Sequence, residues 1–187
     1  MSFTPRALIR SIGSVTTITD NFNRANGALG TRSDGGSWTT ITGVPTIASN
    51  QCQFTTAGEI AANLGHSDFV VSVDITTNWA GFPQIHLRGD GTANNLIIVY
   101  INTDGSVRAA KIIAGTTTGL IGNGTPGEFP QNTKATLQVT VSGSTISAKV
   151  NGVAVGSSPW TETQWQTQTW VGFQGSTADL FDNFSAV

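Results

Sequence analysis

The fold is decided by the stretch from Val171-Gly172-Phe173 to Phe181-Asp182-Asn183-Phe184, read together with Asp20-Asn21-Phe22-Asn23-Arg24 near the start of the chain. The opening phrase continues with Asn-Gly-Ala-Leu-Gly at 26–30 and with Trp38. Between the two phrases, short runs of alternating apolar and polar residues recur, separated by Gly, Asn, Asp and Ser. No helical period of convincing length interrupts them, so the two phrases bracket a single block of β-type sequence.

Three of these runs predict individual strands with defined faces. In residues 69–75, F-V-V-S-V-D-I, every second side chain from Phe69 onward should face the core. In residues 84–88, Ile85 and Leu87 should point inward, whereas His86 and Arg88 should point outward. The unbroken apolar run at 96–101 predicts a central strand that is covered on both faces.

Tight turns separate the remaining strands. Thr-Asp-Gly-Ser at 103–106 leads into a partner strand over 107–113, and hairpins follow at 135–150 and at Asn151-Gly152. Such a meander of short antiparallel strands predicts a β-sandwich or jelly roll. Residues 115–133, which are rich in glycine, predict a long surface loop instead.

Residues 18–187 resemble the concanavalin A-like (laminin-G-like) jelly-roll domains, of the kind found in bacteriophage structural proteins. Beyond the two end phrases, the resemblance includes Ile85-His86-Leu87-Arg88, the run at 96–100, Asp104-Gly105-Ser106-Val107 and the hairpin at 137–152. It implies an all-β antiparallel sandwich in which the first and last strands pair in one sheet. It leaves the function open, since jelly rolls bind sugars, hydrolyse them or build viral particles.

Residues 1–17 precede the first strand of the jelly roll and are not needed to complete the sheet. We interpret them as an N-terminal extended arm, followed by the jelly-roll domain at 18–187. The arm either folds back on its own domain or docks on another subunit. We favour docking, because a free arm should be polar and this one holds several apolar residues, namely Phe3, Leu8, Ile9, Ile12 and Val15.

Composition narrows the classes of partner. Only 11% of the 187 residues are charged and the net charge is −2, without a basic run. We therefore expect no nucleic-acid or membrane partner, since both need clustered lysine and arginine. The apolar stretch at 7–9 is too short for a signal-peptide core, which predicts synthesis in a cytoplasm without export. The single cysteine, Cys52, is expected to be a small core residue.

The carboxylates do not predict catalysis. Laminarinase-type glucanases with this fold place Glu, Asp and Glu at alternate positions of one strand, which supplies a nucleophile and an acid. In this chain the three glutamates are Glu59, Glu128 and Glu162, and none alternates with another acid. His66 and His86 lack metal-ligand spacing. We therefore expect no enzyme activity and no cofactor.

Aromatic and planar polar side chains predict a candidate sugar-binding patch. Because each alternates with core residues on its strand, a group of such residues can share one face of one sheet. The alternative is that the aromatic residues belong to the core and the arginine pairs with Asp74 or Asp90. Trp160 and Trp165, in a loop-like segment, form a second set of possible exposed anchors. The members of the candidate patch are Trp79, His86, Arg88, Tyr100 and Asp74.

A structural calcium ion is a further hypothesis. The resemblance implies a calcium site where the first and last strands meet, at the positions of Asp20 and Asp182, with help from Asn183. Calcium requires six or more oxygen ligands, and few are visible here. The alternative is that both aspartates cap turns.

Taken together, these observations favour a non-enzymatic virion structural protein, either a phage capsid-decoration protein or a minor tail protein. Its expected location is the virion, and its expected partners are other virion proteins, contacted through the arm, and further copies of itself. The alternative is a carbohydrate-binding module, on the same fold, that attaches to a host glycan.

Overall fold

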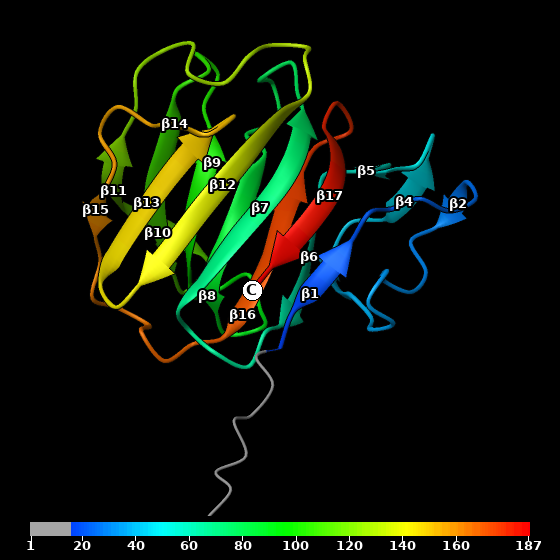
Figure 1. Cartoon of the computed structure of the whole chain (residues 1–187), viewed down its shortest axis with the longest axis horizontal. Helices are drawn as coiled ribbons and strands as arrows, with labels where there is room; N and C mark the ends of the chain where they lie inside the picture. Colours follow the sequence, from blue (N-terminus) through cyan, green and yellow to red (C-terminus); the bar gives the residue numbers. More distant parts are fainter. Residues whose placement is uncertain (1–15) are drawn as a thin grey trace, which may run out of the picture.

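The protein is an all-β sandwich of two antiparallel sheets packed face to face (Figure 1). The computed structural model describes residues 16–187. The predicted arm at 1–17 lies outside this range except for its last two residues, and its docking stays a prediction. Within the described range no helix is long and apolar enough to cross a membrane. The predicted antiparallel, concanavalin-like sandwich is confirmed.

The larger sheet has ten strands in the order β14-β13-β12-β7-β17-β5-β4-β2, with β1 also paired to β17 and β15 to β13. Its members are β1 (Ile18–Asp20), β2 (Gly27–Ala28), β4 (Pro45–Ala48), β5 (Gln51–Phe54), β7 (Phe69–Thr76), β12 (Ala135–Ser142), β13 (Thr145–Val150), β14 (Val153–Ala154), β15 (Trp160–Thr161) and β17 (Leu180–Ala186).

The smaller sheet has seven strands in the order β11-β10-β9-β8-β16-β6-β3. Its members are β3 (Thr39–Thr42), β6 (Gly58–Asn63), β8 (Gln84–Gly89), β9 (Leu96–Ile101), β10 (Val107–Ile113), β11 (Thr116–Asn123) and β16 (Trp170–Gly175).

The two ends of the described chain meet in the larger sheet, as the resemblance to concanavalin A-like domains implies. Strand β1 pairs antiparallel with β17, with Ile18 opposite Ala186 and Asp20 opposite Phe184. Figure 1 shows the two strands, blue and red, side by side at the base of the sheet. The aromatic residues of both phrases meet between the sheets around Phe173, with ring centroids 4.5–6.2 Å from it. These neighbours are Phe22, Trp38, Phe54, Phe181 and Phe184.

The two sheets differ in what they present to solvent. Strand β7 of the larger sheet alternates buried and half-buried residues, as predicted, and its outer face is polar. Strand β9 of the smaller sheet is buried on both faces at nearly every position. Its inward residues join the main core, whereas Leu96 and Ile98 form a second apolar cluster with Ala110, against which Tyr100 and Ile112 pack.

Two sequence expectations are wrong. The segment expected to be a surface loop at 115–133 contains strand β11, which pairs with the free edge of β10 through irregular register. The threonines of this segment favour a strand, and the open edge of β10 supplies unpaired backbone groups for it to bond. The glycines therefore do not prevent pairing, although the register of the two strands is irregular. Trp160, expected in an exposed loop, is 5% exposed in β15, and Trp165 packs against the core.

Cys52 lies in β5 and is fully buried, which agrees with its expected place in the core. Burial, together with the charge of Asp20, raises the pKa of its thiol to about 12. The thiol therefore stays protonated at physiological pH, which makes it a poor nucleophile.

Candidate functional site

The five residues of the predicted sugar-binding patch do not share one face of one sheet, so that prediction is wrong as a group. Asp74 lies on β7 in the larger sheet, where its carboxylate accepts hydrogen bonds from Thr136 and Asn183. His86 and Arg88 lie on β8 and Tyr100 on β9, all in the smaller sheet. Identical alternation on neighbouring stretches of sequence cannot reveal which sheet a strand joins.

Arg88 is fully buried instead of facing outward. Its φ is +48°, at the point where the register of β8 against β16 shifts. The side chain donates from Nε to the Ser67 carbonyl at 2.9 Å and from a terminal nitrogen to Asp68 at 2.8 Å. Its partner is therefore neither Asp74 nor Asp90. An irregularity in a strand interrupts the alternation of side chains between the two faces of the sheet. The sequence pattern therefore predicted that Arg88 faces solvent, although the side chain is buried.

Trp79 lies in the loop between β7 and β8 and packs against the main core. Its indole covers the β9–β10 turn so closely that a Cβ added to Gly105 would come within 2.6 Å of the ring. This placement corresponds to the alternative in which the tryptophan belongs to the core.

The outer face of the smaller sheet carries a line of polar side chains. Directly opposed residues of neighbouring strands share a face. The register places these residues opposite one another from β6 through β16, β8 and β9 to β10, in the order Glu59, Gln174, Gln84, Tyr100 and Arg108.

An open pocket of about 210 Å³ lies on this face, lined by Phe82, Gln84, Ile98, Tyr100 and Thr117. Phe82 is 44% exposed and has a φ of +48°, which is rare for a bulky residue and indicates a constrained loop. Tyr100 was identified from the sequence, but Phe82 and Gln84 were missed. The signal was the large aromatic residue between Gly81 and Pro83, a context typical of an exposed turn.

The polar groups beside this pocket are held in place. Gln84 donates from its amide nitrogen to the Gln174 side chain at 2.6 Å, which leaves the Gln84 carbonyl oxygen available as an acceptor. Arg108 donates from Nε to Ser106 at 2.8 Å and from a terminal nitrogen to Asp104 at 3.1 Å. The side chain and backbone N–H of Ser106 in turn lower the pKa of Asp104, so this anchor stays ionised.

His86 lies on the same face, one pair of residues further along β8 from Gln84. It is 3% exposed, and its Nδ1 lies 2.8 Å from Oε1 of Glu59, which is also 3% exposed. The predicted outward direction of this histidine is correct, but neighbouring residues cover it.

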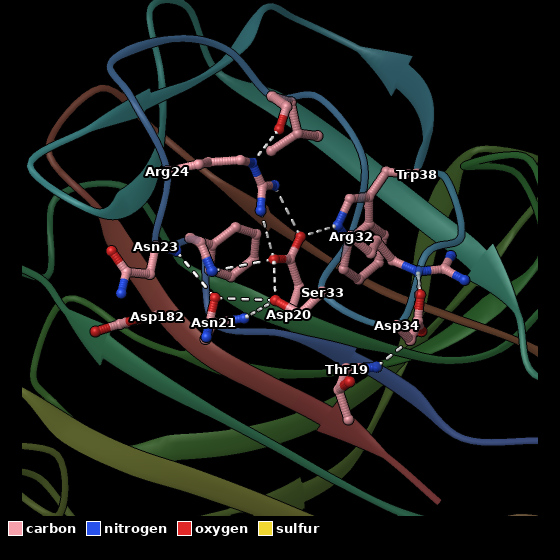
Figure 2. Close-up of polar contacts among 12 residues, drawn as sticks. Thr19, Asp20, Asn21, Asn23, Arg24, Arg32, Ser33, Asp34, Trp38 and Asp182 are labelled. Carbon is pink, nitrogen blue, oxygen red and sulfur yellow. Dashed lines mark hydrogen bonds and ion pairs between the residues drawn. The ribbon is translucent and has the colours of Figure 1, made fainter.

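The predicted calcium site does not fit the residues present. The carboxylate of Asp20 accepts both terminal nitrogens of Arg24, at 2.7 and 2.9 Å, as well as Trp38 Nε1 at 2.8 Å and the Phe22 N–H at 3.0 Å. Figure 2 shows these donors around the carboxylate, with Asp182 to the side and no contact joining the two aspartates. The lone pairs that an ion would need are therefore already engaged.

Asp182 is also a poor cation ligand. The ammonium of Lys134 lies 3.4 Å from its Oδ2, and the backbone N–H of Asn183 donates to its Oδ1. Among residues 16–187 no group of three or more His, Cys, Asp or Glu side chains is placed to hold a metal ion. A pocket beside Asp182 is lined otherwise by amides, those of Asn21, Asn23, Asn50 and Asn183. The turn-capping alternative for Asp20 agrees with its bond to the Phe22 N–H.

We compared the chain with known protein families, with curated proteins and with solved structures. No protein-family model matches the chain, and no curated protein is significantly similar to it in sequence. Solved structures do match. The carbohydrate-binding module CBM66 from Bacillus subtilis superposes with a TM-score of 0.64 and 19% identity, over 80% of this chain and 95% of that one.

Two lectins match as well. The galectin LEC-6 of Caenorhabditis elegans gives a TM-score of 0.53 at 15% identity, over 72% of this chain and 93% of its own. The carbohydrate recognition domain of Emp46p, in its metal-free form, gives 0.58 at 8% identity, over 80% of this chain and 86% of its own. The chain therefore has the concanavalin A-like and galectin-like β-sandwich fold. The solved structures that share this fold with it include a carbohydrate-binding module and lectins.

Proposed function

We propose that this chain is a non-catalytic carbohydrate-binding domain. The glycan binds in the open pocket on the outer face of the smaller sheet. The observation that carries the proposal is that Phe82, Tyr100 and Gln84 line that pocket together, with Arg108 opposite Tyr100 and hydrogen-bonded to Ser106 and Asp104.

The chemistry of this pocket suits a sugar. A sugar ring has apolar C–H faces and a rim of hydroxyl groups, so it needs an apolar surface together with a few fixed donors and acceptors. The aromatic side chains supply the surface. Gln84 supplies an acceptor and Arg108 supplies donors, and because both are already held by neighbours, little side-chain entropy is lost on binding.

The matched structures support the same class of function. One is described as a carbohydrate-binding module, one as a galectin and one as a carbohydrate recognition domain. At these identities the likeness concerns the fold, and the pocket carries the argument for binding.

The virion hypothesis depends on the arm, nearly all of which lies outside the described residues. No observation in residues 16–187 favours it over glycan binding. The virion location, the homo-oligomer and the absence of catalysis stay predictions. A glycan-binding domain that is part of a virus particle would agree with both the virion hypothesis and the glycan-binding proposal.

A glycan array followed by calorimetry tests the proposal. We expect the wild-type protein to bind a defined set of glycans, and Tyr100→Ala and Phe82→Ala each to weaken binding by about tenfold or more. Phe82 is 44% exposed and Tyr100 is half-buried outside the main core, so the melting temperature should fall less than for a substitution in the main core.

Val153→Ala is the matched control, because Val153 is 72% exposed on the other sheet. It should leave binding unchanged. No glycan signal for the wild type, or equal losses for the control and the pocket variants, would contradict the proposal.

A further inference from the structure

A second, smaller pocket lies on the same outer face, over the Glu59–His86 pair. Apart from the pair, its wall includes Trp170, Leu96, Ile41 and Thr92. Its volume is about 10 Å³, which is the room that one water molecule or one hydroxyl oxygen requires.

The pair forms because β16 carries a glycine between its two partners. Strand β16 separates β6 from β8, and Gly172 stands opposite both Ala61 and His86. With no side chain at 172, the imidazole reaches diagonally across β16 to Glu59. A methyl group at Gly172 would collide with the Ile60 carbonyl, so this gap cannot be filled without moving the backbone.

The pair is not satisfied by its own contact. His86 Nε2 has no hydrogen-bond partner in the described residues, and Glu59 Oε1, although at ion-pair distance from Nδ1, makes no hydrogen bond of good geometry. Both residues are more than nine-tenths buried. Buried polar atoms of this kind nearly always have a partner, and here both border a space that fits one oxygen atom.

We propose that this small pocket is a second subsite, which receives a single hydroxyl group of a glycan. The proposal rests on the proposed function and deepens it: the chain recognises a sugar that presents a free, neutral hydroxyl or hydroxymethyl group to the Glu59–His86 pair. A pocket with room for one oxygen cannot admit a position that carries a glycosidic link or a bulky substituent.

The donors and acceptors specify the ligand group. When Nδ1–H of the neutral imidazole faces the Glu59 carboxylate, Nε2 presents a lone pair to the pocket. The pocket therefore offers acceptors and needs a donor, which a hydroxyl supplies. A carboxylate has no donor when ionised, and it would meet the charge of Glu59 without a cation in the pocket wall to offset it. Uronic and other acidic sugar ends should be rejected.

The spacing of the two pockets suits one ligand. Gln84 lines the open pocket and His86 the small one, two residues apart on β8, which is a span of about 7 Å. Ile98 and Leu96 stand in the same relation on β9. One sugar packed on Tyr100 can therefore extend a hydroxymethyl group toward His86.

Calorimetry with matched oligosaccharides tests the subsite. The probes are an oligosaccharide that the array identifies and two analogues, in which the terminal hydroxymethyl group is replaced by a methyl group or a carboxylate. We expect the wild-type protein to bind each analogue at least about tenfold more weakly. In Glu59→Gln the penalty for the carboxylate should shrink markedly, while Tyr100→Ala should weaken all three probes alike.

A second measurement leaves the pocket residues unmutated, so its result does not depend on whether a pocket variant folds. The chain has two histidines, so the imidazole signals of His86 can be assigned in nuclear magnetic resonance spectra with His66→Gln as reference. The Nε2 resonance of His86 should shift with the hydroxymethyl ligand and much less with the methyl analogue. Equal affinity for the three probes, or an unchanged His86 resonance at saturation, overturns the subsite alone. No binding of any glycan overturns both proposals.

Discussion

Two buried carboxylates, those of Asp20 and Glu59, differ in how completely their neighbours in the fold satisfy them. Asp20 is 0% exposed and Glu59 is 3% exposed. Asp20 accepts hydrogen bonds from a guanidinium, an indole and a backbone N–H (Figure 2). Among residues 16–187, Glu59 has one ionisable side chain within ion-pair distance, that of His86, and it borders a pocket. The first carboxylate is satisfied within the fold, whereas the second retains capacity for a ligand.

The two partners also differ in chemistry. Arg24, the partner of Asp20, cannot give up its proton in a protein, so its charge always requires a counter-charge. An imidazole can exist as a neutral ring, so His86 does not require the charge of Glu59 to remain buried. Removing each carboxylate should therefore have different consequences for stability.

The largest effect is expected from Asp20→Asn. The new amide would direct N–H donors at the guanidinium of Arg24 or the indole of Trp38 and leave the partly buried charge of Arg24 without its carboxylate. Breaking a fully buried ion pair costs about 3–5 kcal/mol, and because Arg24 keeps some contact with water we expect a loss near the lower end of this range. Urea unfolding at neutral pH measures the loss in the free energy of unfolding.

Asp182→Asn provides the control for this substitution, because Asp182 pairs at 3.4 Å with Lys134, whose side chain is 51% exposed. A pair with an exposed partner contributes about 0–1 kcal/mol. If Asp20→Asn were no more destabilising than Asp182→Asn, the cluster around Asp20 would not be the structural anchor that we describe.

The difference between the two sites also explains what the sequence could predict. The partners Phe22 and Arg24 lie within four residues of Asp20, and Trp38 is the last residue of the opening phrase, so these three partners are close to Asp20 in the sequence. The strand at 69–75 was likewise predicted from a local pattern, whereas the pairing of β1 with β17 was implied by the resemblance to concanavalin A-like domains. The Glu59–His86 pair joins strands that only the sheet order brings together, and no local pattern reports it.

Errors in the site prediction have a similar origin. Alternation assigns a side chain to a face, but it does not say which sheet the strand joins, and so Asp74 was grouped with His86. The backbone at Arg88 breaks the alternation, and a period of two then fails. Phe82 lies in a loop, where periodicity carries no information. Local sequence therefore predicted the sandwich and its inner face, and missed the contacts that form the outer pockets.

A smaller effect is expected from Glu59→Gln. A glutamine keeps the size and the hydrogen-bonding capacity of the glutamate, and an imidazole, unlike a guanidinium, does not require a counter-charge. The free energy of unfolding should change by less than about 1 kcal/mol at pH 7.5. A loss equal to that of Asp20→Asn would make Glu59 a structural residue and remove the contrast between the two carboxylates.

The smallest effect is expected from calcium. The donors around Asp20 occupy its lone pairs, and Lys134 neighbours Asp182. We therefore expect that the predicted position between these two aspartates offers calcium no site in the native state that the unfolded state lacks. A ligand raises the melting temperature only when it binds the folded state preferentially. The melting temperature in millimolar calcium and in a chelator should therefore agree within about 1 °C. Asp182→Asn distinguishes the remaining case: if calcium stabilised the wild type but not this variant, the ion would bind in the amide-lined pocket beside Asp182. That result would show that a carboxylate satisfied by its neighbours, as Asp20 is, does not exclude a metal from the adjoining surface.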